Sequence, residues 1–402
     1  MNKLNRILII HTDGNTFNNP SLKCIIDLLL GNGFKIDLRY PESHAPMPYT
    51  ENVRFLQYSK LIGRFKHIVF NRLYSKFLMS LLVFVENFLY YRKYDLIIGV
   101  DRQGLLEANI LNKLKKTPYI FISFEIMFAS ETSVKYKSLE INASKNISMW
   151  VVQDEVRAEK LKYENGLKNC NKSILPLASA GLGNINDLRL RDQLSVPKNK
   201  KVAIMIGSVG VWSMASDIIK SIPDWPEDWV LILHERYGRT RKKLENELNE
   251  LAAYINKKIF ISECATEHVD DMSTILSGVD AGIAFYRPDY AGSYTGNNIE
   301  FLGLASGKIS TYLRYGVPVI ANEVGLYAEL IRKHKLGKIV STPEDISNIL
   351  LDFKNVNYTF NAKKYFSQCL DFNIYSENLL TKIRSIINKQ DAIDFSMRKK
   401  ND

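Results

Sequence analysis

Short apolar runs alternate with helical segments along most of this chain, and this alternation constrains the fold more than any other feature. The runs are rich in Ile, Val and Phe, as in strands that are buried on both faces of a parallel sheet. One series lies at 6–10, 34–40, 94–100, 119–124 and 148–153. A second series lies at 201–206, 230–234, 258–262, 281–285 and 317–322. The sequence therefore predicts an α/β fold with two doubly wound, Rossmann-like domains.

A polar, turn-rich stretch separates the two series and marks the domain boundary. We expect an N-terminal domain over 1–175, a linker over 176–200 and a C-terminal domain over 201–375. A helix over 376–389 should follow, and the polar tail 390–402 should be disordered because it has little to bury. Ligands of open α/β sheets bind beyond the carboxyl ends of the strands. A cleft between the two domains is therefore where the site is expected.

Composition excludes several classes of protein. The chain has 402 residues, of which 46% are hydrophobic and 24% charged, which argues against disorder and against a fibrous repeat. The four cysteines are far apart and show no zinc spacing, so free thiols in a reducing compartment and no structural metal are expected. The most hydrophobic stretch, 77–91, contains Glu86 and Asn87 and is shorter than the about 20 apolar residues of a spanning helix. No signal peptide is recognisable. We therefore expect a cytoplasmic protein.

Positive charge is concentrated in the first domain. Residues 1–175 hold 25 basic and 16 acidic side chains, whereas the rest of the chain holds 29 and 27. Within the first domain, 51–94 carries eight Lys or Arg, two Glu and 11 aromatic residues. This composition favours a helix in an anionic headgroup layer, with contacts from Arg64, Lys66, Arg72 and Lys76. Alternatively, the aromatic residues pack on their own domain while the lysines face water. No nucleic-acid module accompanies the segment, so nucleic acid is not an expected partner.

One segment of the second domain has the pattern of an anion site. Ser306 can cap a helix, Gly307 lets a ligand approach the backbone, and Lys308 adds a cation beside the free N–H groups of the first turn. The helix is expected to end at Gly316, and Pro318 begins the next strand. The pattern suits a diphosphate. The alternative is an ordinary capped helix with a surface lysine.

The residues from Ser306 to Ile320, together with the order of elements, resemble the signature region of GT-B-fold glycosyltransferases. The likeness is to the retaining, family-4-like enzymes of bacterial polysaccharide and O-antigen assembly. The resemblance implies that the second domain binds a nucleotide-diphosphate sugar and that the first domain, facing it across the cleft, binds the acceptor. Thr311 stands where the family usually has a glutamate. A carboxylate can accept two hydrogen bonds from a ribose, and threonine cannot.

Other donor-site residues follow from the same resemblance. Gly207, Ser208 and Gly210 come directly after the run 201–206 and look like the glycine-bearing loop that passes the nucleotide phosphates. The family often has an Arg and a Lys-Gly pair shortly after this loop, and this chain has neither. Arg236 and Arg287 are therefore candidates for a second cation at the leaving group, or else each forms a surface ion pair.

Four polar residues follow strands of the first domain. Asp101 and Glu125 come at the ends of the third and fourth runs, and His11 and Asp13 follow the first. The resemblance implies that these loops hold the acceptor and contact the transferred sugar. Any of them could instead be a helix cap or a hydrogen-bonded loop residue. A retaining reaction would use the leaving phosphate to help deprotonate the acceptor, whereas an inverting one would need a general base such as His11 or Asp13.

These observations predict a glycosyltransferase that moves a sugar from a nucleotide-diphosphate sugar to a glycan acceptor in cell-surface polysaccharide or lipopolysaccharide biosynthesis. We expect this acceptor to be linked to a lipid. The enzyme should lie at the inner face of the cytoplasmic membrane. It should need no cofactor and no metal, since no Asp-x-Asp motif lies near a suitable strand end. Two alternatives stay open: a GT-B-fold nucleotide-sugar 2-epimerase, and a catalytically inactive glycan- or membrane-binding homologue.

Overall fold

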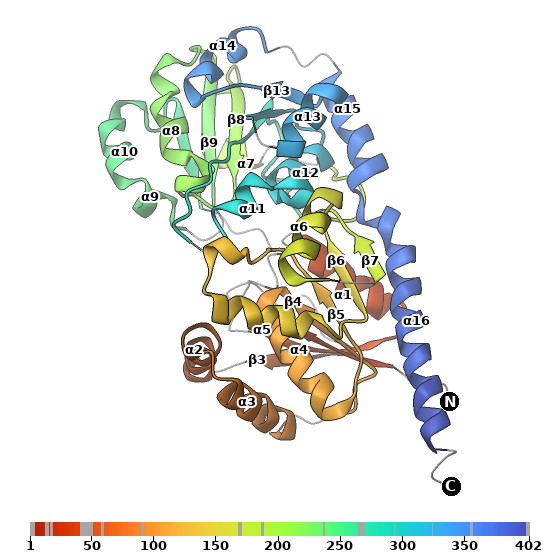
Figure 1. Cartoon of the computed structure of the whole chain (residues 1–402). Coiled ribbons are helices and arrows are strands. Elements are labelled where there is room, and N and C mark those ends of the chain that lie inside the picture. Colours follow the sequence, from red (N-terminus) through yellow and green to blue (C-terminus); the bar gives the residue numbers. More distant parts are fainter. Residues whose placement is uncertain are drawn as a thin grey trace. The chain divides into compact units, whose positions relative to one another are not determined.

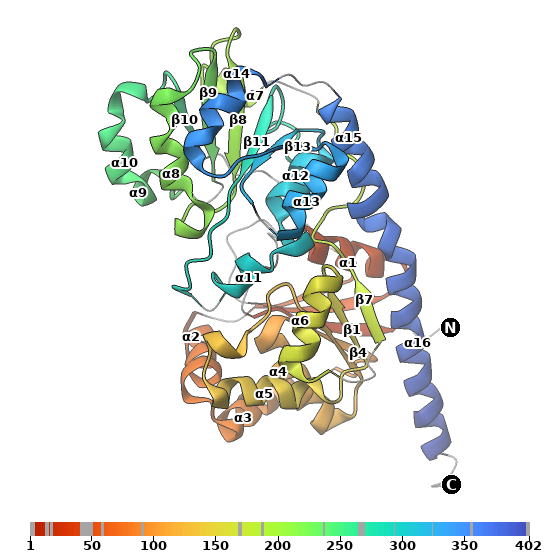
Figure 2. The ribbon, with the colours of Figure 1, turned by 45° about the horizontal axis from the view of Figure 1, so that its top comes forward.

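The chain forms two compact α/β units, which are described separately. Unit 1 comprises Met1–Pro176 and Tyr375–Asp402, and unit 2 comprises Leu177–Ile374. Figure 1 shows the elements of both units in the computed structural model, and Figure 2 shows them after a rotation. The structure describes residues 5–12, 16, 19–40, 51–57, 60–89, 92–167, 171–185, 189–235, 238–263, 270–292, 294–323, 325–353 and 357–398.

The described part of unit 1 contains a seven-stranded parallel sheet in the order β3-β2-β1-β4-β5-β6-β7. Its strands are β1 (Arg6–Ile10), β2 (Lys35–Tyr40), β3 (Val53–Gln57), β4 (Leu96–Val100), β5 (Tyr119–Ile122), β6 (Met149–Val152) and β7 (Asn171–Ile174). Apolar residues fill β1 and β4 because both faces of the sheet are covered. Beyond the five strands that the sequence predicts, β3 and β7 extend the sheet at its two edges.

Helices of unit 1 cover the sheet on both sides. They are α1 (Pro20–Gly31), α2 (Lys60–Ile68), the π-helical η2 (Val69–Leu73), α3 (Lys76–Leu89), α4 (Asp101–Lys115), η3 (Ala129–Glu131), α5 (Val134–Ser144), α6 (Glu155–Asn165) and α16 (Phe372–Arg398). Helices α3, α4 and α5 lie side by side (Figures 1 and 2). Helix α16 contacts α1, where Arg384 donates a 2.8 Å hydrogen bond to Asn32.

Two glycines let α4 approach β1 and β4 closely. A Cβ atom on Gly99 would lie 2.6 Å from the carbonyl oxygen of Gly104, and one on Gly104 would overlap the carbonyl oxygen of Ile10. Any larger residue at either position would push the helix away from the sheet. Because of this close packing, the start of α4 at Asp101 lies directly against the ends of the two central strands.

Unit 2 forms, within its described residues, a six-stranded parallel sheet in the order β10-β9-β8-β11-β12-β13. Its strands are β8 (Lys201–Ile206), β9 (Trp229–His234), β10 (Ile259–Ser262), β11 (Ala281–Ala284), β12 (Val319–Ala321) and β13 (Gly337–Ile339). Five of them match the predicted second series, and β13 is an additional edge strand. The prediction of two doubly wound parallel α/β sheets is therefore confirmed.

The helices of unit 2 bury two apolar clusters, one on each face of its sheet. One cluster lies under α12 and α15, and the other under α8 and α14. The α-helices are α7 (Arg189–Gln193), α8 (Ala215–Lys220), α9 (Thr240–Lys243), α10 (Glu245–Glu250), α11 (Asn297–Glu300), α12 (Gly307–Arg314), α13 (Gly325–His334), α14 (Ile346–Leu351) and α15 (Tyr358–Tyr365). Short turns of other helix types are η4 (Val211–Ser213), η5 (Ile222–Asp224), η6 (Ala252–Tyr254), η7 (Gly303–Ala305), η8 (Pro343–Asp345) and η9 (Phe366–Leu370).

The stretch between the two series of strands and the C-terminal tail both differ from what the sequence predicts. The stretch 176–200, expected as a linker, is part of unit 2: the Leu177 N–H donates a 3.0 Å hydrogen bond to the Leu304 carbonyl, and Leu190 and Val196 lie in the core. The expected disordered tail is wrong over 390–398, because α16 continues to Arg398. The last four residues lie outside the described part of the chain.

Candidate functional site

The switch point of the unit 2 sheet brings together the predicted anion-binding residues. Strands β8 and β11 are neighbours in the sheet: after β8 the chain continues to β9 on one side, and after β11 it continues to β12 on the other side. At such a switch point a crevice lies beyond the carboxyl ends of the two strands. Gly207 follows β8, and Tyr286 closely follows β11. Helix α12 begins beside them with Ser306 as its cap and Lys308 in its first turn.

The ammonium group of Lys308 is buried without a hydrogen-bond partner among the described residues. Its side chain is only 8% exposed, and Nζ lies 5.1 Å from the ring centre of Trp212 and 5.6 Å from that of Tyr286. Burial lowers the pKa of Lys308 to about 7. A cation held among aromatic rings and away from water is costly unless an anion joins it. The arrangement therefore suits a negatively charged ligand.

Gly207 lies close to the Lys308 side chain. Its backbone has a φ of +88°, which glycine adopts without strain, and an added Cβ atom would lie 3.3 Å from Lys308 Cε. Its N–H donates a 3.0 Å hydrogen bond to the carbonyl oxygen of His234 at the end of β9. A side chain at Gly207 would both strain the backbone and crowd the lysine.

The first turn of α12 leaves N–H groups available beside Lys308. Ser306 Oγ accepts a 3.1 Å hydrogen bond from the N–H of Ile309 and lies 2.5 Å from the Tyr286 hydroxyl. The N–H groups of Gly307 and Lys308 have no intrahelical partner because they belong to the first turn. Helix N-termini with free N–H groups bind phosphates, and here a buried lysine lies at the same place.

Tyr312 fixes α12 on the sheet. Its hydroxyl accepts a 3.0 Å hydrogen bond from the N–H of Ile206 and donates to the carbonyl oxygen of Ile204 at 3.0 Å. The ring lies against Gly282, where any Cβ atom would overlap it. Tyr312 of the predicted signature therefore has a structural role, because it holds the helix that carries Lys308 against the end of β8.

Two aromatic residues of this site were not predicted from the sequence. Trp212 and Tyr286 stack with ring centres 6.0 Å apart. Asn322 holds Tyr286 in place, since its amide donates to the Tyr286 carbonyl oxygen at 2.7 Å and its Oδ1 accepts from the Tyr286 N–H at 3.0 Å. Trp212 lies two residues after Gly210, and an aromatic residue so near the glycine loop is the feature that could have suggested it.

The other predicted donor residues are less closely tied to Lys308. Arg287 forms a 2.9 Å ion pair with Asp217, which is the alternative that the sequence left open for this arginine. Gly210 has an extended backbone with a φ of −177°, and its N–H bonds to Ser213 Oγ at 3.0 Å. Ser208 and Thr311 are half-buried, and Arg236 lies outside the described residues.

Unit 1 has its own switch point, between β1 and β4, and two predicted acceptor-site residues meet there. His11 follows β1, and Asp101 follows β4 with a φ of +51°, which is rare for a residue with a side chain. Asp101 Oδ2 lies 3.7 Å from His11 Nε2, and His11 Nδ1 lies 2.9 Å from Thr16 Oγ1. A backbone outlier at this place suggests a functional constraint. Asp13 lies outside the described residues.

Asp101 also holds the loop after β5 by hydrogen bonds. The alternative that this residue is a hydrogen-bonded loop residue therefore applies to Asp101 as well. Asp101 Oδ1 accepts from the N–H groups of Phe124 at 2.8 Å and of Glu125 at 3.0 Å. Arg157 also donates a 2.8 Å hydrogen bond to the Phe124 carbonyl oxygen. The backbone of Glu125 is thus fixed while its side chain is exposed.

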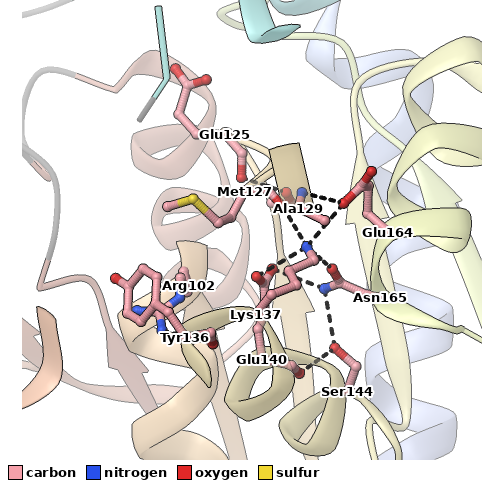
Figure 3. Close-up of polar contacts among 11 residues, drawn as sticks. Arg102, Glu125, Met127, Ala129, Tyr136, Lys137, Glu140, Ser144, Glu164 and Asn165 are labelled. Atoms are coloured by element: carbon pink, nitrogen blue, oxygen red, sulfur yellow. Dashed lines mark hydrogen bonds and ion pairs between the residues drawn. The ribbon is translucent and has the colours of Figure 1, made fainter. Parts of the chain in front are cut away.

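A buried lysine anchors the continuation of this loop, as Figure 3 shows. Lys137 donates to the Met127 carbonyl oxygen and, at 2.7 Å, to Asn165 Oδ1, and it forms a 3.2 Å ion pair with Glu140. Glu164 lies 3.6 Å from Lys137 and accepts from the Ala129 N–H at 2.7 Å. Helices α5 and α6 therefore fix the loop that carries Glu125. The sequence gives no sign of this network, because its members lie on separate elements.

The basic, aromatic segment forms α2, η2 and α3, and one predicted membrane contact in it is wrong. Lys66 is 1% exposed, and its Nζ lies 2.9 Å from carboxylate oxygens of both Glu86 and Glu107. Arg39 lies 3.4 and 3.6 Å from the same two groups. Lys66 therefore balances buried carboxylates between α2, α3 and α4 instead of reaching solvent.

Many of the other side chains of this segment are exposed, and most of these are apolar or cationic. Arg64, Arg72 and Lys76 are exposed. Large apolar side chains are also exposed, at Leu61, Ile62, Phe65, Ile68, Leu73, Phe77, Leu81, Phe84, Val85, Phe88 and Leu89. We call these exposed residues the α2–α3 face. Phe77 and Phe88 of this face are mostly exposed, whereas Phe70 of the same segment is buried in its own domain.

Metal sites and membrane spans can be assessed only for the described residues. Among them, no group of three or more His, Cys, Asp or Glu side chains is arranged to hold a metal ion. No helix in the same part of the chain is long and apolar enough to cross a bilayer.

Comparison with known proteins identifies the fold. Residues 271–383 match the family model of the glucosyltransferase 3-like C-terminal domain. No curated protein matches the chain. Among solved structures, Anabaena Alr3699/HepE in complex with UDP is 15% identical with a TM-score of 0.66, and the match covers 94% of this chain and 100% of that one.

Two further solved structures agree. Sucrose-phosphate synthase from Thermosynechococcus elongatus is 12% identical with a TM-score of 0.70, covering 96% of this chain and 100% of that one. WaaG, a glycosyltransferase involved in lipopolysaccharide biosynthesis, is 14% identical with a TM-score of 0.64, covering 93% and 98%. The chain therefore has the GT-B fold, as the sequence predicted. The closer likeness to family-4-like enzymes stays a prediction.

Proposed function

We propose that the protein is a glycosyltransferase whose unit 2 binds a nucleoside-diphosphate sugar at the end of β8. The observation that carries the proposal is the buried Lys308 ammonium, which has no hydrogen-bond partner in the described chain and lies at the N-terminus of α12. Two comparisons support the choice of ligand: the match of 271–383 to a glucosyltransferase domain model, and HepE, which has been solved with UDP and with UDP-glucose.

The chemistry of the transfer explains why such a lysine is useful. When the bond between the sugar and the diphosphate breaks, negative charge grows on the leaving phosphate. Lys308 and the first N–H groups of α12 would stabilise that charge as it develops. The nearby rings of Trp212 and Tyr286 exclude water and so strengthen the interaction. In this proposal the leaving group needs no metal ion and the enzyme needs no cofactor.

We place the acceptor in unit 1, at the switch point with His11 and Asp101. Because Asp101 Oδ1 is occupied by two backbone N–H groups, Oδ2 is the oxygen that remains for the His11 side or for a substrate hydroxyl. We propose a retaining transfer of a hexose, which rests on the resemblance of the segment that begins at Ser306. In such a reaction the leaving phosphate helps to deprotonate the acceptor.

We further propose a lipid-linked glycan acceptor and peripheral attachment at the inner face of the cytoplasmic membrane, in cell-surface polysaccharide biosynthesis. The support is the α2–α3 face, which combines exposed apolar side chains with exposed Arg64, Arg72 and Lys76. The single acidic residue within 60–89, Glu86, is buried. A surface with apolar and purely cationic groups fits an anionic bilayer.

A thermal-shift screen with UDP, GDP, dTDP, CMP, ADP and their sugars tests the donor site, since a ligand of the folded state raises the apparent stability. One diphosphate should raise Tm for the wild-type chain and for Lys201→Ala, an exposed lysine of unit 2 that pairs with Asp228. The shift should vanish in Lys308→Ala. No shift with any nucleotide would contradict the proposal, and consumption of the sugar nucleotide without an acceptor would favour the 2-epimerase.

A further inference from the structure

Unit 1 contains a cavity that neither switch point accounts for. It lies between α3, α4 and α5 and has a volume of about 450 Å³. Helix α4 starts at the switch point with Asp101, whereas the cavity is lined by its later residues, from Leu106 to Leu114. Figures 1 and 2 show the three helices side by side. The cavity is thus a separate site, and its volume is in the range of small-molecule pockets, about 300–1,000 Å³.

The lining of this cavity combines apolar side chains with three lysines and with four uncharged polar residues, Ser80, Asn109, Asn142 and Asn146. Met79, Leu106 and Leu139 are buried and form part of the lining. Three exposed lysines, Lys76, Lys113 and Lys145, also line it, one from each of α3 and α4 and one directly after α5. The lining includes no Asp or Glu. A ligand that matches both features carries hydrocarbon and negative charge together.

The cavity is continuous with the α2–α3 face. Lys76 belongs to both, and the next residue, Phe77, is 74% exposed. A bilayer in contact with this face would therefore bring lipid molecules to the mouth of the cavity. The arrangement favours a lipid over a free phosphate ion, because a phosphate ion would make no contact with the apolar side chains of the lining.

We propose that this cavity binds one anionic phospholipid, with hydrocarbon against Met79, Leu106 and Leu139 and the phosphate among Lys76, Lys113 and Lys145. The site goes beyond the proposed glycosyl transfer, since it needs neither nucleotide nor acceptor. It would hold unit 1 on the membrane through a specific lipid, in addition to general attraction of the α2–α3 face to a charged surface.

The test is calorimetric titration of the full chain with dihexanoyl phosphatidylglycerol below its micelle concentration. We expect saturable binding of one lipid per chain, and binding at least about 10-fold weaker for dihexanoyl phosphatidylcholine, which has no net charge. Inorganic phosphate should not compete at millimolar concentration. Equal affinity for the two lipids would overturn the proposal, and so would competition by phosphate alone, which would indicate a phosphate site without a chain.

Variants separate this site from the rest of the α2–α3 face. Ile110→Trp should fill the cavity and abolish binding, and Lys113→Gln with Lys145→Gln should weaken it about 10-fold or more. Ile110 is partly exposed, so the larger ring can be accommodated, and an unchanged Tm would show that the variant folds. Arg64→Gln with Arg72→Gln removes exposed charges outside the cavity and should leave binding unchanged. Normal lipid binding by Ile110→Trp would disprove the site, whereas the nucleotide thermal shift tests the proposed transfer separately.

Discussion

Gly207 lies so close to Lys308 that a Cβ atom at the glycine would be 3.3 Å from Cε of the lysine. This pair joins the loop after β8 to the first turn of α12. It also means that the free space around the lysine ammonium depends on the absence of a side chain at position 207.

Replacing Gly207 should therefore weaken donor binding. In Gly207→Ala the backbone must keep a φ of +88°, which costs an L-residue about 1 kcal/mol, and the new methyl group displaces Lys308. We expect affinity for the preferred nucleoside diphosphate to fall about 10-fold, measured by calorimetry. Gly292→Ala is a matched control, because the nearest atom to its added Cβ is at 3.5 Å. An equal loss of nucleoside diphosphate affinity in the two variants would argue against a role of Gly207 in donor binding.

Removing the Lys308 ammonium should slow the transfer. Lys308→Ala should lower turnover by about 10²-fold or more, because it removes the cation in the first turn of α12 that would stabilise the leaving diphosphate. The measurement is release of the nucleoside diphosphate with saturating donor, with Lys201→Ala as the control. Near-normal turnover in Lys308→Ala would remove this lysine from the mechanism.

Lys308 should also make stability depend on pH. Burial lowers its folded-state pKa to about 7, whereas the unfolded chain has the ordinary value of about 10.4. Between these values the unfolded chain binds more protons, so the contribution of this group to the free energy of unfolding rises with pH. Lys308→Met lacks the buried charge and should be more stable than the wild type at pH 6–7. Its advantage should shrink toward pH 9–10 in urea unfolding, and a pH-independent difference would contradict this account.

Lys66 should be needed for stability and not for membrane contact. Lys66→Met leaves the buried carboxylates of Glu86 and Glu107 with Arg39 as their remaining cation. Removing one partner of a buried ion pair costs about 3–5 kcal/mol, so unfolding by urea should need correspondingly less denaturant. Arg72→Gln changes an exposed charge on the same segment and should alter stability by less than about 0.5 kcal/mol. A stable Lys66→Met variant would mean that the network adds little.

Binding to anionic vesicles should depend on the exposed apolar residues of the α2–α3 face. Phe77 and Phe88 are 74% and 76% exposed, so Phe77→Asp with Phe88→Asp should leave the fold intact. We expect the double variant to lose sedimentation with phosphatidylglycerol vesicles even at low salt. Tyr163→Asp changes an equally exposed aromatic residue on α6 and is the control. Unchanged sedimentation of the Phe77/Phe88 variant would exclude this face as the membrane contact.

The central strands and the α12 anion site could be predicted from local sequence. Buried strands such as β1 and β4 are continuous apolar runs, and Ser306 to Lys308 combines a cap, a glycine and a cation in three consecutive residues. The strands that prediction missed lie at sheet edges. The segments Asn171–Ile174 and Gly337–Ile339 are short and partly polar, so their apolar pattern is too weak to distinguish them from loops.

Contacts between distant residues could not be predicted in the same way. Lys66 meets Glu107 across 41 positions of sequence, and nothing local to Lys66 distinguishes an inward lysine from a solvated one. The left-handed backbone of Asp101 could not be predicted either, because an aspartate at a strand end ordinarily has a negative φ. Only the folded chain displays these two features.

The division of the chain has a consequence for the order in which it folds. Residues from Tyr375 onward belong to unit 1, and Lys382 donates a 2.6 Å hydrogen bond to the carbonyl oxygen of Lys172 at its edge strand. During synthesis the ribosome makes nearly all of unit 1, then the whole of unit 2, and only then the helix that returns to unit 1. Co-translational folding normally completes the N-terminal domain first. Here the segment that completes unit 1 is made only after the whole of unit 2, so a chain truncated before residue 375 would contain every residue of unit 2 but would lack the last part of unit 1.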